Sequence, residues 1–353
     1  MPKSTERAPV PSRARRRTKR LLVALGVVLL LVSAAATGYG YTMHRYDQNV
    51  AREKGVIDEN RKDRPNKALD VEAQNWLVVG SDTRAKDGTS GEDAKGPLWQ
   101  RGAQRTDTMM IVHLAEDNEQ ISVTSLPRDT WVDIPGHGKG RLNAAFSYGG
   151  PRLLVRTVEQ LTSVPIDHYA AIDFAGFKTM TNAVGGVDVT VPRTVTDCSN
   201  GTVWRKGKHH LNGRRALLYV RQRCGLPNGD LDRIRRQQAF LLALLDRARS
   251  KDVLASPRRL DQLLDATSKS ITVDDSVSGG MLRSLAFHYR NTRQDDLTFL
   301  TLPIRGGGMV AGQAVLFMDD AKAAKLFKAL RNDTVDEYAE DEGGEGNNLK
   351  PPA

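Results

Sequence analysis

The segment that most constrains the fold of this chain is an uncharged, apolar run from Leu21 to Thr42. A helix of that length crosses the hydrocarbon core of a bilayer, which is roughly 30 Å thick. Positions 1–20 carry eight basic residues against a single acidic one, Glu6. Because basic flanks stay on the cytoplasmic side, we predict a cytoplasmic tail over 1–20, a transmembrane helix over 21–42 and a domain outside the cytoplasm after it. The predicted location is therefore the cell membrane, with a single span.

A cleaved signal peptide is the alternative interpretation of this segment, because Ala34 to Ala36 resemble a cleavage site. The apolar run is longer than the core of a signal peptide, about 7–15 residues, which favours an uncleaved anchor. Both interpretations place the body of the protein outside the cytoplasm.

The formal net charge of +10 is misleading as a guide to partners. Most of it comes from the basic cluster at positions 1–20, so the remainder of the chain is close to neutral. A near-neutral body argues against a general polyanion-binding surface, and we expect no nucleic-acid partner.

The two cysteines of the chain, Cys198 and Cys224, both follow the apolar run. Oxidation is permitted outside the cytoplasm, so we predict a disulfide between them, with a stabilisation of about 3–4 kcal/mol. Two unpaired buried thiols are the alternative. A zinc site is not indicated, because there is no C-x-x-C pair.

Short apolar runs typical of strands alternate with amphipathic helical patterns over much of the chain. The alternation predicts an α/β fold, an αβα sandwich with a central mixed β-sheet and helices on both faces. We place this domain at 71–335. The charged segment over 43–70 is predicted to be a juxtamembrane linker, and the acidic, glycine-bearing tail over 336–353 is predicted to be disordered.

Two aspartates lie at the ends of predicted strands. Asp82 follows the strand Trp76–Val79, and Asp107 precedes the strand Thr108–Leu114. Loops at strand ends are where α/β sheets place ligands, and paired carboxylates suit Mg²⁺, a cation that prefers oxygen. The alternative for either residue is a turn or capping role.

Arginines also gather at element ends. Arg105 lies two residues before Asp107, and Arg128 follows the predicted strand 120–126. Arg221 and Arg223 point the same way if the helix capped by Asn212 ends near residue 219, because residues two apart share one side of an extended chain.

A second predicted helix, from about 230 to 248, places Asp230, Arg233 and Gln237 on one face. Guanidinium groups match phosphate oxygens and stay charged, so the arginines together suit a diphosphate. Solvated arginines in surface salt bridges are the alternative. The chain contains no G-x-x-x-x-G-K-S/T, G-x-S-x-G or H-E-x-x-H motif, which argues against a nucleotide P-loop, a serine hydrolase elbow and a zinc protease.

Ten short motifs, in order along the chain, resemble the LytR–CpsA–Psr family and cover about residues 71–250. The motif core spans residues 75–250, and the segment between Asp82 and Asp107 is longer than is usual for the family. The motifs are Asn75–Asp82, Arg105–Met110, Leu126–Thr130, Ile134–Gly136, Asn143–Ala145, Ile166–Tyr169, Gly185–Asp188, Leu211–Gly213, Tyr219–Arg223 and Asp230–Gln238. The paired cysteines are similar to an actinobacterial-type variant of the family.

The resemblance implies an Mg²⁺-dependent phosphotransferase that moves a cell-wall glycopolymer from a polyprenyl-pyrophosphate carrier to the muramic acid hydroxymethyl group of peptidoglycan. It also implies an apolar slot for the polyprenyl chain, so the implied partners are the lipid-linked glycopolymer, peptidoglycan and membrane lipid. Asp82 and Asp107 match the carboxylates associated with Mg²⁺, and Asp230 matches an acid that orients arginines. The implied pyrophosphate contacts are Arg105, Arg128, Arg221, Arg223, Arg233 and Gln237.

Three other functions compete with this interpretation. A polyprenyl-pyrophosphate hydrolase would use water as the acceptor, and a binding protein would hold lipid-linked precursors without reaction. A membrane-bound transcriptional regulator is disfavoured by the predicted topology and by the near-neutral body.

Overall fold

The computed structural model describes residues 40, 42–67, 72–83, 104–116 and 120–342, with the side chains of residues 82, 83, 104, 105, 294 and 342 excluded. The chain divides into two units, residues 1–48 and residues 49–353. In the first unit, residues 42–48 are helical. The predicted cytoplasmic tail lies outside the described residues, and so does nearly all of the predicted span. No helix in the described part of the chain is both long and apolar enough to cross a membrane.

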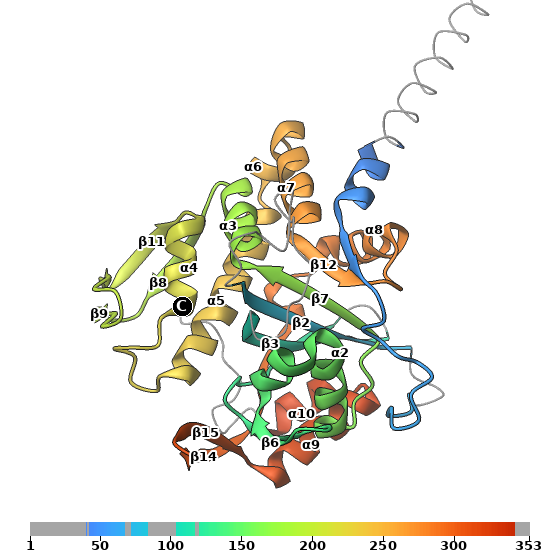
Figure 1. Cartoon of the computed structure of the whole chain (residues 1–353). Coiled ribbons are helices and arrows are strands. Elements are labelled where there is room, and N and C mark those ends of the chain that lie inside the picture. Colours follow the sequence, from blue (N-terminus) through green and yellow to red (C-terminus); the bar gives the residue numbers. More distant parts are fainter. Residues whose placement is uncertain (1–39, 41, 68–71, 84–103, 117–119, 343–353) are drawn as a thin grey trace, which may run out of the picture. The chain divides into compact units, whose positions relative to one another are not determined.

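A seven-stranded sheet organises the described part of the second unit, in the order β1-β12-β7-β2-β3-β4-β13 (Figure 1). Three neighbouring pairs are parallel (β1 with β12, β7 with β2, β4 with β13) and three are antiparallel. The predicted mixed sheet is thus confirmed. The strands are β1 Ala51–Glu53, β2 Gln74–Thr83, β3 Gln104–Leu114, β4 Ile121–Ser125, β7 His168–Asp173, β12 Ile271–Asp274 and β13 Leu297–Thr301.

Successive side chains of the central strands pack alternately into two different hydrophobic cores, one on each face of the sheet. Leu77 and Val79 of β2 pack with α2 (Leu142–Thr162) and α9 (Asp320–Asn332) on one face. Trp76, one residue along, joins a cluster with α8 (Gly279–His288) on the other face. Figure 1 shows α2, α9 and α10 (Val335–Glu342) together on one side of β2 and β3. Because successive strand residues point to opposite faces, this alternation produces the predicted αβα sandwich.

A smaller lobe is built on the second face. Its core surrounds Trp204, which is fully buried, and contains residues of α3 (Phe174–Ala183), α4 (Gly213–Arg221) and α5 (Asp230–Ala248). The N-caps of α3 and α4 are side chains of Asp173 and Asn212, which accept backbone hydrogen bonds. The remaining elements are β5 Trp131–Ile134, β6 Gly138–Arg141, β8 Val187–Val191, β9 Val195–Thr196, β10 Val203–Trp204, β11 Gly207–Leu211, α6 Lys251–Leu254, α7 Pro257–Ser270, β14 Ile304–Val310 and β15 Gln313–Met318.

The domain boundaries predicted from composition need correction at both ends. Residues 51–53 form β1 and pair with β12, so the predicted linker over 43–70 is largely part of the folded unit. Arg61 and Arg64 of the same segment form ion pairs with Glu159, which is 1% exposed. A buried carboxylate requires such partners, which explains why this polar segment is ordered. At the other end, α10 shows that the tail predicted to be disordered is helical as far as residue 342.

The carboxylate of Asp274 anchors the end of β12. It accepts hydrogen bonds from the backbone N–H groups of Tyr169 (2.8 Å) and Ser276 (3.0 Å), and His168 lies 3.5 Å away. Burial by itself would raise the pKa of this carboxyl, but the hydrogen bonds from His168, Ser276 and Tyr169 outweigh it and hold the pKa below its usual value.

Candidate active site

An irregularity in the pairing of β2 with β3 displaces Asp107 from the ladder. Gly80 pairs with Thr108 and Ser81 with Thr106, which leaves Asp107 as an extra residue on β3. Such a β-bulge interrupts the ladder and redirects a side chain, and bulges are frequent beside active sites. Two positions further, Asp82 and Arg105 are register partners, so their backbones are adjacent. Their side chains fall outside what the structure describes, and their predicted roles stay predictions.

Arg128 reaches Asp107 from the neighbouring strand. The segment Pro127 to Asp129 follows β4, and the Nη1 atom of Arg128 donates to Oδ1 of Asp107. The other carboxylate oxygen, Oδ2, lies 4.0 Å from Nη2 of Arg221. Asp107 therefore joins two of the predicted arginines.

Asp129 is a centre of contacts that the sequence did not reveal. Its Oδ1 accepts from Arg141 at 3.3 Å, and its Oδ2 accepts from Arg223 at 3.3 Å. Nε of Arg128 lies 3.6 Å from the same Oδ2. Arg141 was missed because it ends β6, a strand of a hairpin that sequence patterns did not predict.

Arg221 and Arg223 come from the end of α4, where the sequence predicted them. The helix runs two residues further than expected, so Arg221 is its last residue and Gln222 is extended. The Arg221 guanidinium lies over the Phe174 ring at 4.2 Å, and Nε of Arg223 lies 2.6 Å from Asp230. Both arginines line one cavity despite this shift.

Of the three residues predicted on one face of α5, Arg233 and Gln237 line the same cavity, and Asp230 pairs with Arg233 beside it. Nη2 of Arg233 donates to Asp230 at 2.7 Å and to the backbone oxygen of Asp107 at 3.4 Å. Arg233 is 3% exposed, and burial lowers its pKa to about 10, opposed by the charge of Asp230. Gln237 donates to the Val220 carbonyl at 3.2 Å, so it also fastens α5 to the end of α4.

The cavity has a volume of about 290 Å³ and two chemically different parts. Its charged rim carries Asp107 and the four described arginines of the predicted set. Its interior lies between the sheet and helices α3, α4 and α5, and it is lined by apolar side chains. The interior residues are Val78, Met110, Ile172, Phe174, Phe177, Leu217, Phe240 and Leu241. None of these was predicted, although alternation along β2 and β3 places Val78 and Met110 on the face away from the first core.

Two guanidinium atoms at the rim have unused hydrogen-bonding capacity. The Nε atoms of Arg128 and Arg233 are buried and donate no hydrogen bond to any described residue. An unsatisfied buried donor costs free energy, and native structures usually supply a partner. A ligand oxygen at the rim would satisfy them.

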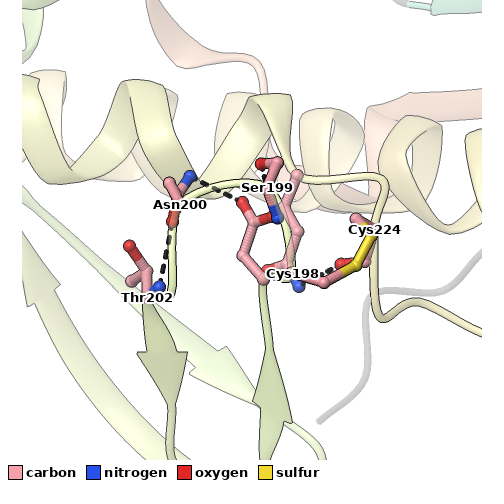
Figure 2. Close-up of a disulfide and its surroundings, with 7 residues drawn as sticks. Cys198, Ser199, Asn200, Thr202 and Cys224 are labelled. Atoms are coloured by element: carbon pink, nitrogen blue, oxygen red, sulfur yellow. Dashed lines mark hydrogen bonds between the residues drawn. A yellow bond between two sulfur atoms is a disulfide. The ribbon is translucent and has the colours of Figure 1, made fainter.

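The cysteines lie beside the same segment. Figure 2 shows the disulfide between Cys198, in the turn that joins β9 to β10, and Cys224, which directly follows Arg223; their Cα atoms are 5.3 Å apart. The turn is held by Asp197, which is buried and accepts from Ser199 (2.9 Å to its backbone N–H) and Asn200 (2.8 Å). The link ties the chain beside Arg223 to this hydrogen-bonded turn.

Several known proteins are similar to this chain in sequence and in fold. The probable cell wall biosynthesis protein LcpB of Corynebacterium glutamicum is 37% identical over 259 residues, which covers 73% of this chain and 61% of LcpB. The polyisoprenyl-teichoic acid–peptidoglycan teichoic acid transferase TagU of Enterococcus faecalis is 30% identical, covering 89% of this chain and 97% of TagU. The crystal structure of Bacillus subtilis TagV matches with a TM-score of 0.58 and 30% identity, covering 75% of this chain and 97% of that structure.

The extent of the matches differs between relatives. This chain spans about six tenths of the length of LcpB and of LcpA from the same organism, 61% and 63% respectively. The LytR_cpsA_psr family profile, by contrast, matches residues 40–332, which include every described residue of the site. The chain therefore belongs to the LytR_cpsA_psr family.

Proposed function

We propose that this protein is a phosphotransferase that moves a glycopolymer from a polyprenyl-pyrophosphate carrier to the muramic acid hydroxyl of peptidoglycan. The observation that carries the proposal is one cavity with an apolar interior and an arginine rim. A polyprenyl chain is apolar and its head is a diphosphate, so the two parts of the cavity complement the two parts of the carrier. The names of TagU and TagV relatives, teichoic acid transferases, support the same reaction class.

The rim has the charge that the reaction requires. In the transfer, the acceptor hydroxyl oxygen bonds to the phosphorus that carries the glycopolymer, and the bond from that phosphorus to the bridging oxygen breaks. The hydroxyl loses its proton, and polyprenyl phosphate leaves with the bond electrons. Negative charge grows on the bridging oxygen as this bond breaks, and fixed guanidinium groups stabilise it without rearranging.

Asp107 and Asp129 are the two carboxylates beside the rim arginines that could accept the proton of the hydroxyl, and they differ in availability. Both oxygens of Asp129 accept hydrogen bonds from arginines, which leaves it suited to holding those side chains in place. Oδ2 of Asp107 accepts no hydrogen bond from a described residue. Of the two, Asp107 is better placed to receive a proton or to face a cation.

The donor chemistry of the site fits Mg²⁺. This ion is commonly held by one or two carboxylates together with substrate phosphates and waters. Within the described residues there is no cluster of three or more His, Cys, Asp or Glu side chains that could hold a metal alone. Asp107, with Asp82 as its predicted companion, would hold the ion beside the diphosphate. Bound there, Mg²⁺ would supply further neutralisation of phosphoryl charge.

We also propose that residues 21–42 anchor the protein in the membrane, with the catalytic domain outside, and that Cys198 and Cys224 are oxidised there. The lipid carrier itself lies in a membrane, so an anchored enzyme meets it in place. A reporter at the C-terminus that is active only in the cytoplasm tests the topology. Activity of that reporter would refute the membrane anchor and favour an intracellular regulator.

The decisive experiment replaces two rim arginines in the full chain. With a polyprenyl-pyrophosphate-linked glycan as donor and peptidoglycan as acceptor, we expect Arg221→Ala with Arg223→Ala to abolish release of polyprenyl phosphate. Arg214→Ala is the matched control, because Arg214 is exposed on the same helix and does not line the cavity. Full activity of the double variant contradicts the diphosphate role of the rim.

The same assay separates the competing functions. A hydrolase releases polyprenyl phosphate equally well without peptidoglycan, whereas a transferase needs the acceptor and leaves labelled glycan attached to it. A binding protein retains the donor and releases nothing.

A further inference from the structure

A second cavity, of about 500 Å³, lies on the neighbouring face of α5. Arg233, Gln237 and Leu241 of this helix line the first cavity. Asp232, Arg236 and Ala239 line the second, at positions that share a different helical stripe. No role has yet been given to this cavity, and none of the predicted site residues lines it.

The most informative residue in the second cavity is Arg236, which is 8% exposed. Its Nη1 donates to the neutral amide oxygen of Gln222 at 2.6 Å, and its guanidinium lies over the Tyr219 ring at 4.5 Å. Within the described residues no carboxylate lies within ion-pair distance of it. Arg233, by comparison, has Asp230 at 2.7 Å. A buried cation without a counter-ion is unfavourable, so a bound anion would stabilise Arg236.

The nearest acidic groups are already engaged elsewhere. The carboxylate of Asp232 accepts from the backbone and side chain of Asn228, at 3.1 and 3.2 Å, and from Arg235 at 3.2 Å. Asp197 is occupied by the turn that contains Cys198. Their charges act on Arg236 only through space.

The rest of the lining is suited to a sugar that carries a negative charge. Arg193 and Arg235 add two exposed guanidiniums at the rim, against Asp232 as the one acidic residue of the described lining. Oε1 of Gln238, also in the lining, is buried and accepts no hydrogen bond from a described residue, so a ligand hydroxyl could donate to it. Arginines match an anionic group, and a free amide oxygen matches a sugar hydroxyl.

From these observations we infer that the second cavity binds an anionic sugar unit of a cell-wall glycan, with its carboxylate or phosphate against Arg236. The inference rests on the proposed function for the origin of the sugar, which is either the peptidoglycan acceptor or the transferred polymer. Gln222, the partner of Arg236, stands between Arg221 and Arg223, so Arg236 connects the second cavity to the segment that presents both arginines to the first cavity.

The test is a ligand-observed NMR titration of the full chain in detergent with three sugars. N-acetylmuramic acid carries the carboxylate that the acceptor sugar has where no peptide is attached, glucose 1-phosphate carries a phosphate as a polymer would, and N-acetylglucosamine is the neutral counterpart. We expect one or both anionic sugars to bind and the neutral sugar not to bind. The tighter of the two anionic sugars identifies the source of the ligand.

Substitutions locate the binding. Arg236→Gln should raise the dissociation constant by roughly tenfold to a hundredfold, because a charged hydrogen bond is lost. Arg236→Lys should retain part of the affinity. Arg249→Gln, just beyond α5 and outside the lining, should have no effect. If Arg236→Gln does not fold, Arg193→Gln with Arg235→Gln at the exposed rim takes its place, with weaker binding expected.

Two results overturn the inference. One is the absence of binding of both anionic sugars to the unsubstituted protein, and the other is binding that the Arg236 or rim substitutions leave unchanged. Arg221→Ala with Arg223→Ala should abolish transfer yet leave sugar binding intact, so a failure of the second cavity is distinguishable from a failure of the proposed reaction.

Discussion

Replacing Asp230 with Asn measures what the site gains from pairing its buried arginine. The carboxylate contacts Arg233 at 2.7 Å and Arg223 at 2.6 Å. The Arg223 side chain is 44% exposed, and such a pair contributes up to about 1 kcal/mol. Arg233 is 3% exposed, and removing one partner of a buried pair costs about 3–5 kcal/mol. We therefore expect Asp230→Asn to lower the free energy of unfolding by about 3–5 kcal/mol, mostly through Arg233.

Urea unfolding of the full chain in detergent, with its disulfide intact, gives this quantity. Asp246→Asn is the matched control, because Asp246 pairs with Arg249 at 3.2 Å near the exposed end of the same helix, and its loss should cost at most about 0.5 kcal/mol. Adding Arg233→Met to Asp230→Asn removes the unpaired charge and should restore most of the lost stability. A loss below about 1 kcal/mol, or a double variant no more stable than the single one, would refute the reasoning.

Three further predictions concern other parts of the fold. The pKa of the Asp274 carboxyl is lower in the folded state than in the unfolded state. The ionised carboxylate therefore stabilises the fold fully above the unfolded pKa of about 3.9, and this contribution is lost as the pH falls through the folded pKa. Asp274→Asn should remove that part of the acid dependence in unfolding measured from pH 2 to 6, and an unchanged pH profile would contradict it. Cys198→Ser should lower the free energy of unfolding by about 3–4 kcal/mol, and it should weaken donor binding because the disulfide adjoins Arg223. Equal stability of the reduced and oxidised protein in urea would contradict this prediction. Phe177→Glu, in the apolar interior of the first cavity, should raise the KM for a polyprenyl donor at least tenfold while leaving a short-chain soluble donor unaffected, and equal effects on both donors would exclude a lipid slot.

Central strands of the sheet could be predicted because each contains a short apolar run in its own sequence. The predicted strands Trp76–Val79 and Thr108–Leu114 lie within β2 and β3, and the helix from Asp230 to Ala248 has the predicted bounds because an apolar stripe repeats along it. β14, which contains three consecutive glycines from Gly306, was missed. It has no alternating pattern and exists because it pairs with β15. β1 was missed for the same reason, as its polar residues are strand only against β12.

The site was predictable in its residues but not in its geometry. Arg221 and Arg223 could be singled out from their spacing, although the helix before them ends later than expected. The bulge at Asp107 depends on the register between two strands, which no local pattern encodes. The apolar interior was also beyond reach, because it combines side chains from three strands and three helices that meet only in the folded chain.

The arrangement of charge at the rim explains how several arginines can stay close together before any substrate arrives. Guanidinium groups that line one cavity repel one another, and without anions between them they would move apart into solvent. Three carboxylates instead form ion pairs with these arginines, and the arginines still outnumber the carboxylates, so the net charge of the rim is positive. The pairs are Asp107 with Arg128, Asp129 with Arg223 and Arg141, and Asp230 with Arg233 and Arg223. A diphosphate then meets donors that are already in place, so little of its binding free energy is spent on reorganisation, and the same fixed donors remain aligned as charge develops in the reaction.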